Sequence, residues 1–296
     1  MKEYTRTDLA VEKRGQTRTG VCAKLCREEK IGKATVSEIL LQSDEDKVEG
    51  GGKYISVSCE RLWELEGEEF DGICTLVALE LRKLSRKITS KKLDNDFGVL
   101  IAGLGNSDIT ADSIGPLTVK NLTVTRHLRQ MAPNIYKGLG SCEISALAPG
   151  VLGQTGIETV ELIRGAVQNS EPDIVIAVDA LVARSCERLA STVQISDVGI
   201  NPGSGIGNYR KAITRESLGV PVISVGVPTV VDSSTLVYEA LGKAGIENIS
   251  GELENVLEGG KSFFVTPKES DIIAKKISTL LSESIGRAFS LLWYKE

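Results

Sequence analysis

The chain has 296 residues, of which 41% are hydrophobic and 25% are charged, and its net charge is −5. This balance is typical of a globular protein with an ordinary core, and it argues against a broad basic surface for nucleic acid. The N-terminus is too polar for a signal peptide, and no apolar stretch approaches the roughly 18 residues that a membrane span needs.

The first part of the chain predicts a polar N-terminal stretch, two strands and a helix. Residues 1–20 are polar and charged. Residues 33–42 and 53–61 have strand character, and an acidic, glycine-rich segment separates them, so we expect an N-terminal antiparallel β-hairpin. Residues 68–90 then carry apolar side chains at helical spacing.

From residue 97 onward, strands alternate with helices. We expect strands over 97–102, 141–147, 173–178, 191–196 and 220–225, and helices near 116–130, 156–169, 181–189, 233–243 and 266–289. The last helix opens with Thr-Pro-Lys-Glu, which has the pattern of a capping box with proline in the first turn. This alternation predicts an α/β fold, a three-layer sandwich with a mostly parallel central sheet.

Two of the expected strands deliver an aspartate. One apolar run ends in a glycine loop that leads to Asp112, and a second run ends directly in Asp179. Ligands bind beyond the carboxyl ends of parallel strands, so the two carboxylates can share a site. One of two coupled carboxyls can activate water while the other donates a proton, which suits peptide hydrolysis. The alternatives are a metal ion bridged by the same carboxylates, and two separate aspartates that merely cap helices.

Two glycine-rich segments are candidate ligand-binding loops. Gly103 and Gly105 follow a strand, but Asp108 stands where a dinucleotide-binding loop has its third glycine, and its charge would oppose a pyrophosphate. No phosphate-binding GxxxxGK[ST] motif exists. The second segment, 199–208, is either a backbone nest for an anion or peptide carbonyl, or a flexible connector.

The histidine and cysteine content limits the possible metal chemistry. His127 is the single histidine, and we expect it late in a helix in a structural role. The six cysteines contain no Cys-x-x-Cys pair, which indicates reduced thiols and a cytoplasmic protein.

Motifs spread in order over nearly the whole chain resemble those of one family. They are RTDLAVE (6–12), GLGN (103–106), ADSIGP (111–116), LTVTRHL (122–128), PGVLGQTGIE (149–158), AVDALVARS (177–185), QISDVG (194–199), PGSGIGN (202–208), GVPVI (219–223), GVPTVVD (226–232) and FVTPKE (264–269). The chain resembles the germination proteases of spore-forming bacteria, endopeptidases that begin the degradation of small acid-soluble spore proteins.

The resemblance implies an α/β fold similar to that of hydrogenase-maturation peptidases, with Asp112 and Asp179 as the catalytic pair. It also implies a homotetramer in the cytoplasm of the spore core, made as a zymogen that cleaves itself. The processing site then falls between Asp8 and Leu9, which makes residues 1–8 a propeptide and 9–296 a single peptidase domain.

The remaining expectations concern ligands. We expect Gly203, Ser204 and Gly205 to bind substrate, and we expect no cofactor, membrane or nucleic-acid partner. The aspartate pair leaves room for a divalent metal ion. The alternatives are a nickel-dependent maturation-type peptidase of the same fold, which a single histidine disfavours, and a non-catalytic nucleotide-binding module, which Asp108 disfavours.

Overall fold

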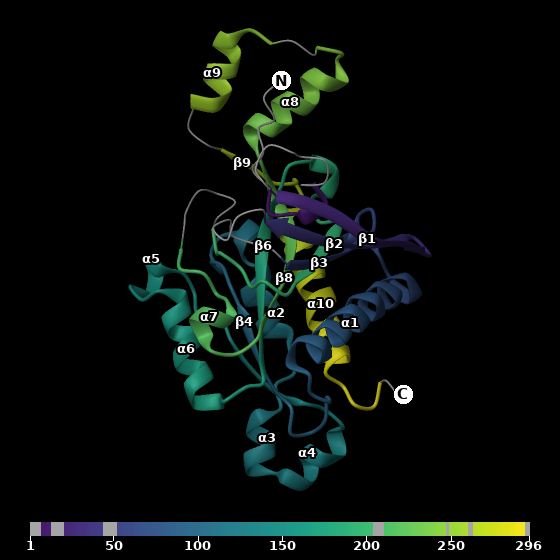
Figure 1. The fold of residues 1–296 in the computed structure, drawn as a ribbon, viewed down its shortest axis with the longest axis vertical. Helices are drawn as coiled ribbons and strands as arrows, with labels where there is room; N and C mark the ends of the chain where they lie inside the picture. Colours follow the sequence, from purple (N-terminus) through teal and green to yellow (C-terminus); the bar gives the residue numbers. More distant parts are fainter. Residues whose placement is uncertain are drawn as a thin grey trace.

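A computed structural model describes residues 7–12, 21–43, 52–203, 210–246, 249–259 and 263–293 (Figure 1). They form an α/β fold around one large mixed sheet with strand order β1-β2-β3-β7-β8-β6-β4-β5, and β9 pairs with β8. The strands are β1 (Val21–Ile31), β2 (Ala34–Ser43), β3 (Gly52–Ser58), β4 (Gly98–Gly103), β5 (Glu143–Leu147), β6 (Ile174–Ala183), β7 (Thr192–Ser196), β8 (Val222–Asp232) and β9 (Phe264–Val265).

Helices cover both faces of the sheet. On one face α1, α2 and α10 pack over the main core, and on the opposite face α6 packs over β4 and β6 (Figure 1). The helices are α1 (Gly67–Thr89), α2 (Ile114–Asn121), α3 (Arg126–Met131), α4 (Pro133–Leu139), α5 (Leu152–Thr155), α6 (Thr159–Ser170), α7 (Arg215–Leu218), α8 (Ser233–Lys243), α9 (Gly251–Gly259) and α10 (Ser270–Ala288). None of these described helices is long and apolar enough to cross a membrane.

The prediction of a mostly parallel sheet is wrong. Among the described strands, only the pairings of β5 with β4, β4 with β6 and β6 with β8 are parallel. The N-terminal strands join the same sheet through antiparallel pairing of β3 with β7 and of β7 with β8, so the sheet is mixed. β2 also pairs antiparallel with β3. Residues 44–51, which would connect them as a hairpin, lie outside the described residues, and the likeness to hydrogenase-maturation peptidases stays a prediction.

Two predicted helices are also corrected. The helix expected over 116–130 ends at Asn121, because the backbone N–H of Thr125 donates to Ile144 of β5 and its hydroxyl accepts from the N–H of Ile144, which pulls the chain away from the helix axis. The helix expected over 181–189 is absent. Instead β6 continues to Ala183, held by its pairing with β8, and only a 3-10 turn, Cys186–Arg188, follows.

The start of the last helix differs as well. α10 begins at Ser270 rather than in the Thr-Pro-Lys-Glu segment, since the preceding Phe264–Val265 pairs with β8. The predicted helices at 68–90 and 233–243 and the strands at 97–102 and 191–196 are confirmed within a residue.

A short N-terminal segment lies on the part of the sheet that α6 leaves uncovered. We call residues 7–12 the leader. Leu9 packs against β6 and β8, and Ala10 packs against β2, so both side chains are fully buried.

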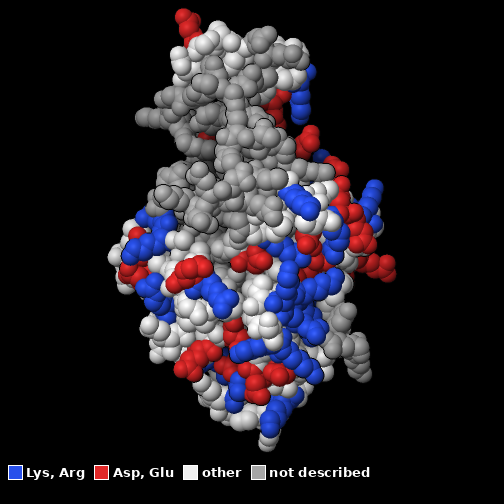
Figure 2. Space-filling view, viewed as in Figure 1, with Lys and Arg blue, Asp and Glu red and all other residues white. Residues whose placement is uncertain are grey.

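On the face seen in Figure 2, acidic and basic side chains are interleaved over the lower half of the molecule.

Candidate active site

The sequence predicted Asp179 at the end of a strand, but the residue lies in the middle of β6. Its side chain is 6% exposed, and its Oδ1 accepts a hydrogen bond of 2.9 Å from the backbone N–H of Ala180. Because side chains alternate along a strand, Asp179 shares one face of β6 with Leu181 and Ala183, which contact the leader. The interpretation of Asp179 as a helix cap is wrong, because no helix follows it directly.

Asp112 reaches the same region from the neighbouring strand β4. It ends the 3-10 turn Thr110–Asp112, and its Oδ2 accepts a hydrogen bond of 2.8 Å from the N–H of Asn106. Ser113, not Asp112, is the N-cap residue of α2. The loop after β4 therefore folds back on the Asp112 carboxylate.

The glycines of this loop permit that approach. Gly105 has a φ of +108°, and a Cβ on it would lie 2.1 Å from the carbonyl oxygen of Asp112. A Cβ on Gly103 would lie 2.2 Å from the carbonyl oxygen of Gly115. The close approach of the backbone therefore explains the two glycines of this loop. Asp108 accepts a hydrogen bond of 3.1 Å from Nε2 of Gln154.

The two aspartates interact electrostatically. Burial raises the pKa of Asp112, although the hydrogen bond from Asn106 opposes the shift. Burial also raises the pKa of Asp179 well above its usual range, and the negative charges of Asp112 and Asp8 raise it further. The structure thus brings the two predicted residues together, and the pair holds a proton to higher pH than two isolated carboxyls would.

The leader adds a peptide backbone beside Asp179. The N–H of Asp8 donates to the carbonyl of Val182 over 3.0 Å, and the N–H of Val182 donates to Asp8 Oδ2 over 2.9 Å. Leu9 fills a pocket formed by Leu181, Ala183 and Val231. The leader is therefore held by β6 at Val182, beyond Asp179 on the same strand.

Two further side chains fix the leader, and the sequence did not predict either role. The side-chain amide of Gln194 accepts from the N–H of Ala10 over 2.7 Å and donates to the carbonyl of Asp8 over 2.9 Å. Glu12 accepts from the backbone N–H of Arg184 over 2.7 Å and of Ser185 over 2.9 Å, and from the hydroxyl of Thr7. The available signal was a glutamine between Val193 and Ile195, two apolar residues of the buried strand β7.

Comparison with known proteins decides the family. The germination protease family model matches residues 2–244. The germination proteases of Clostridium acetobutylicum and Caldanaerobacter subterraneus subsp. tengcongensis are 38% and 40% identical to the chain, over 96% of it and over 94% and 93% of their own lengths. The chain belongs to the germination protease family. The germination protease of Bacillus velezensis is 40% identical over 80% of the chain and 66% of its own length.

Membership of this family makes the chain an endopeptidase. The Asp112 and Asp179 carboxylates with the adjoining leader form its candidate active site. Among the described residues, no three His, Cys, Asp or Glu side chains gather as they would around a metal ion.

The other residues singled out in the sequence lie apart from the carboxylate pair or outside the described ranges. Gly203 is described, in a turn with φ of +74°, whereas Ser204 and Gly205 lie outside the described residues. His127 is exposed near the start of α3, not late in a helix. The side chains of Cys26, Cys59, Cys74, Cys142 and Cys186 are free thiols.

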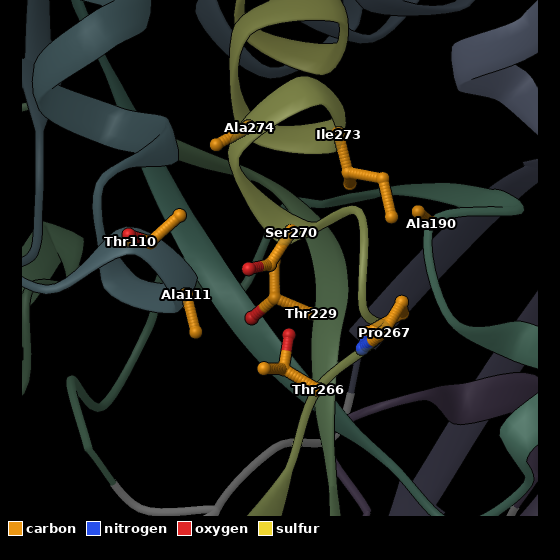
Figure 3. A pocket seen from close by; sticks show the side chains of 9 residues that line it. All are labelled: Thr110, Ala111, Ala190, Thr229, Thr266, Pro267, Ser270, Ile273 and Ala274. Carbon is orange, nitrogen blue, oxygen red and sulfur yellow. The ribbon is translucent and has the colours of Figure 1, made fainter.

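A small cavity borders the turn that carries Asp112 (Figure 3). Its volume is about 10 Å³, and the hydroxyls of Thr229, Thr266 and Ser270 lie close together on one side of it. This is about the space of a single water molecule. The cavity is lined by Thr110, Ala111, Ala190, Thr229, Thr266, Pro267, Ser270, Ile273 and Ala274, and it is too small for a peptide.

Proposed function

We propose that this endopeptidase cleaves small acid-soluble spore proteins during germination, and that it is made as a zymogen that first cleaves its own Asp8–Leu9 bond. The single observation that carries the proposal is the leader itself. Its Asp8 is hydrogen-bonded to Val182 of β6, the strand that carries Asp179, and the charge of Asp8 acts on the Asp179 carboxyl. The leader therefore lies as an internal substrate would.

The chemistry follows from the unequal surroundings of the two carboxyls. Burial raises the pKa of both carboxyls and each accepts one backbone N–H, but the charges of Asp112 and Asp8 also raise the pKa of Asp179, so the shared proton favours Asp179. Asp112 then acts as the base that activates water, and Asp179 as the acid that protonates the departing nitrogen.

The docking contacts indicate which peptides fit. Leu9 occupies a closed apolar pocket, and Ala10 is buried against Ile39 and Leu41, where a larger side chain would clash. An acidic residue followed by an apolar residue and alanine is the substrate pattern that the leader offers. We extend the proposal to a homotetramer in the spore core, with residues 1–8 as the propeptide and 9–296 as one peptidase domain.

The experiment uses the full chain, its Asp112→Asn and Asp179→Asn variants, and a purified small acid-soluble spore protein, with and without chelator. We expect each substitution to lower cleavage at least 100-fold without changing the circular dichroism spectrum. A variant that keeps wild-type activity would remove its aspartate from the mechanism. Activity that disappears with chelator and returns with a divalent cation would replace the metal-free mechanism with a metal-dependent one.

Self-processing is tested separately with Asp8→Ala, read by mass spectrometry of the N-terminus. This substitution deletes the carboxylate that accepts from the N–H of Val182. We expect removal of residues 1–8 to slow at least tenfold. Normal removal would show that the Asp8–Leu9 bond is not selected by this contact.

A further inference from the structure

Gln194 stands in register with Asp179 across three adjacent strands. Asp179 of β6 pairs with Gly226 of β8, and Gly226 pairs in turn with Gln194 of β7. Residues directly opposite each other in a ladder point to the same face, and neighbouring strands lie about 4.8 Å apart. The two side chains therefore rise from the same face of the sheet, about 10 Å apart at their bases.

The residue between them has no side chain. Gly226 leaves the space above β8 to Leu181, whose side chain would lie 2.6 Å from a Cβ at that position. Leu181 in turn packs against Leu9 of the leader. The leader backbone thus meets this row at the amide of Gln194, and the charge of Asp8 acts on the Asp179 carboxyl.

The orientation of the Gln194 amide follows from its two partners. The backbone N–H of Ala10 is a donor only, so the atom that it meets at 2.7 Å is the amide oxygen. The amide nitrogen therefore faces the carbonyl oxygen of Asp8, 2.9 Å away. The side chain is 6% exposed, so water competes weakly for either bond.

We propose that Gln194 is a catalytic residue of this peptidase, the donor that stabilises the oxyanion formed on the carbonyl of the cleaved bond. This inference rests on the proposed cleavage between Asp8 and Leu9, because the carbonyl that Gln194 touches belongs to that bond. An oxyanion donor lies 2.7–3.1 Å from the oxygen on which charge develops, as the Gln194 nitrogen does here. A buried donor with a fixed orientation is effective because it need not reorganise during the reaction.

The step balances with water as the only co-reactant. Asp112 takes one proton from water, whose oxygen bonds to the Asp8 carbonyl carbon, and the π electrons move onto the carbonyl oxygen. Gln194 Nε2 donates to this oxyanion. The electrons then return, the bond to the Leu9 nitrogen breaks, and that nitrogen receives the proton of Asp179. The products are a carboxyl on Asp8 and an amine on Leu9, and the two aspartates have exchanged protonation states.

The test measures the first-order rate of self-processing in the full chain, with Gln194→Ala and Gln194→Glu beside the wild type. We expect Gln194→Ala to slow cleavage about 10²–10³-fold, the usual effect of removing one oxyanion donor. A glutamate has the shape of glutamine, and its protonated form can accept from Ala10 and donate to Asp8. We therefore expect the rate of Gln194→Glu relative to wild type to rise as the pH falls toward 4.

Ser56→Ala is the matched control. Ser56 lies opposite Gln194 in the ladder between β3 and β7 and is equally buried, and its hydroxyl has no hydrogen-bond partner among the described residues. We expect its self-processing rate to stay within threefold of wild type.

A second readout separates chemistry from docking. Hydrogen exchange of the leader is followed in an Asp179→Asn background, which keeps the leader attached. If Gln194 acts on the oxyanion, Gln194→Ala leaves the N–H groups of Val182 and Arg184 protected, because other leader residues hold them. Loss of that protection together with the rate would assign Gln194 to docking and overturn the proposal, as would an unchanged rate. A wild-type chain that does not cleave at Asp8–Leu9 would instead refute the proposed function.

Discussion

The glycine at position 105 tests how Asp112, which we propose to be catalytic, is placed. A Cβ at Gly105 would lie 2.1 Å from the carbonyl oxygen of Asp112 and 2.9 Å from its Oδ1. Ordinary contacts of a Cβ begin near 3.4 Å, so Gly105→Ala has to push the Asp112 turn back by about 1 Å. A displacement of this size at a reacting group can lower the rate about 100-fold. We expect that loss in peptide cleavage.

The φ of Gly105 also strains any other residue, so the effect of strain has to be separated from the effect of displacement. Gly156 is the control, because its φ is +70° and nothing lies within 4 Å of its Cβ position. Gly156→Ala therefore carries only the backbone strain of a left-handed alanine, about 1–2 kcal/mol. Its melting temperature falls while its activity stays near wild type.

The assay compares kcat for cleavage of a spore-protein substrate with the melting temperature of each variant. The reasoning predicts that Gly105→Ala loses activity at temperatures where both variants are fully folded. If Gly105→Ala and Gly156→Ala keep equal activity, the position of the Asp112 turn does not limit the reaction, and the argument from the glycine loop fails.

Two other predictions concern stability and docking. Burial and the charge of Asp112 raise the pKa of Asp179 in the folded chain. Above pH 3.9, about the ordinary pKa of an aspartate, the folded state therefore binds more protons than the unfolded state. The free energy of unfolding then falls as the pH rises. Asp179→Asn should therefore be more stable than wild type at pH 7, by about 1.4 kcal/mol for each pH unit of that elevation, and chemical denaturation should show the gap closing toward pH 4. Leu9→Ala removes a fully buried side chain at a typical cost of about 2–5 kcal/mol, here to leader docking, so self-processing should slow more than tenfold and an added protease should cut the leader faster. A stability difference between Asp179→Asn and wild type that does not change with pH would contradict the first prediction. A leader that resists the added protease in Leu9→Ala would contradict the second.

The parts of the fold with strong local patterns could be predicted from the sequence. The helix at α1 and the strand at β4 have unbroken periodicity and clear ends, and both appear within a residue of the expected bounds. The extension of β6 beyond Asp179 could not be predicted in the same way. Its last residues, which include Leu181, also suit a helix, and they become a strand because β8 and the leader give them partners.

The residues of the candidate site also differ in whether they could be predicted from the sequence. The aspartates were identifiable because each follows an apolar run in the sequence, and parallel neighbouring strands bring such positions together, although Asp179 itself lies within β6. Gln194 and Glu12 were not, because their roles depend on contacts between residues 172 to 186 positions apart in sequence. Nothing in the local sequence of either residue indicates those partners.

The leader connects the architecture to the regulation that we propose. The same short segment completes a core on the open face of the sheet, through Leu9 and Ala10, and presents the carbonyl of its Asp8–Leu9 peptide bond to Gln194. If it is removed, the pocket around Leu181, the groove beside Ile39 and the amide of Gln194 all lose their partners at once. The surface that then becomes available has the shape and the hydrogen-bonding groups to take an equivalent segment from another chain. Cleavage between Asp8 and Leu9 leaves Leu9 and Ala10 on the mature chain, so self-cleavage would uncover this binding site for substrate once the new N-terminus leaves its pockets.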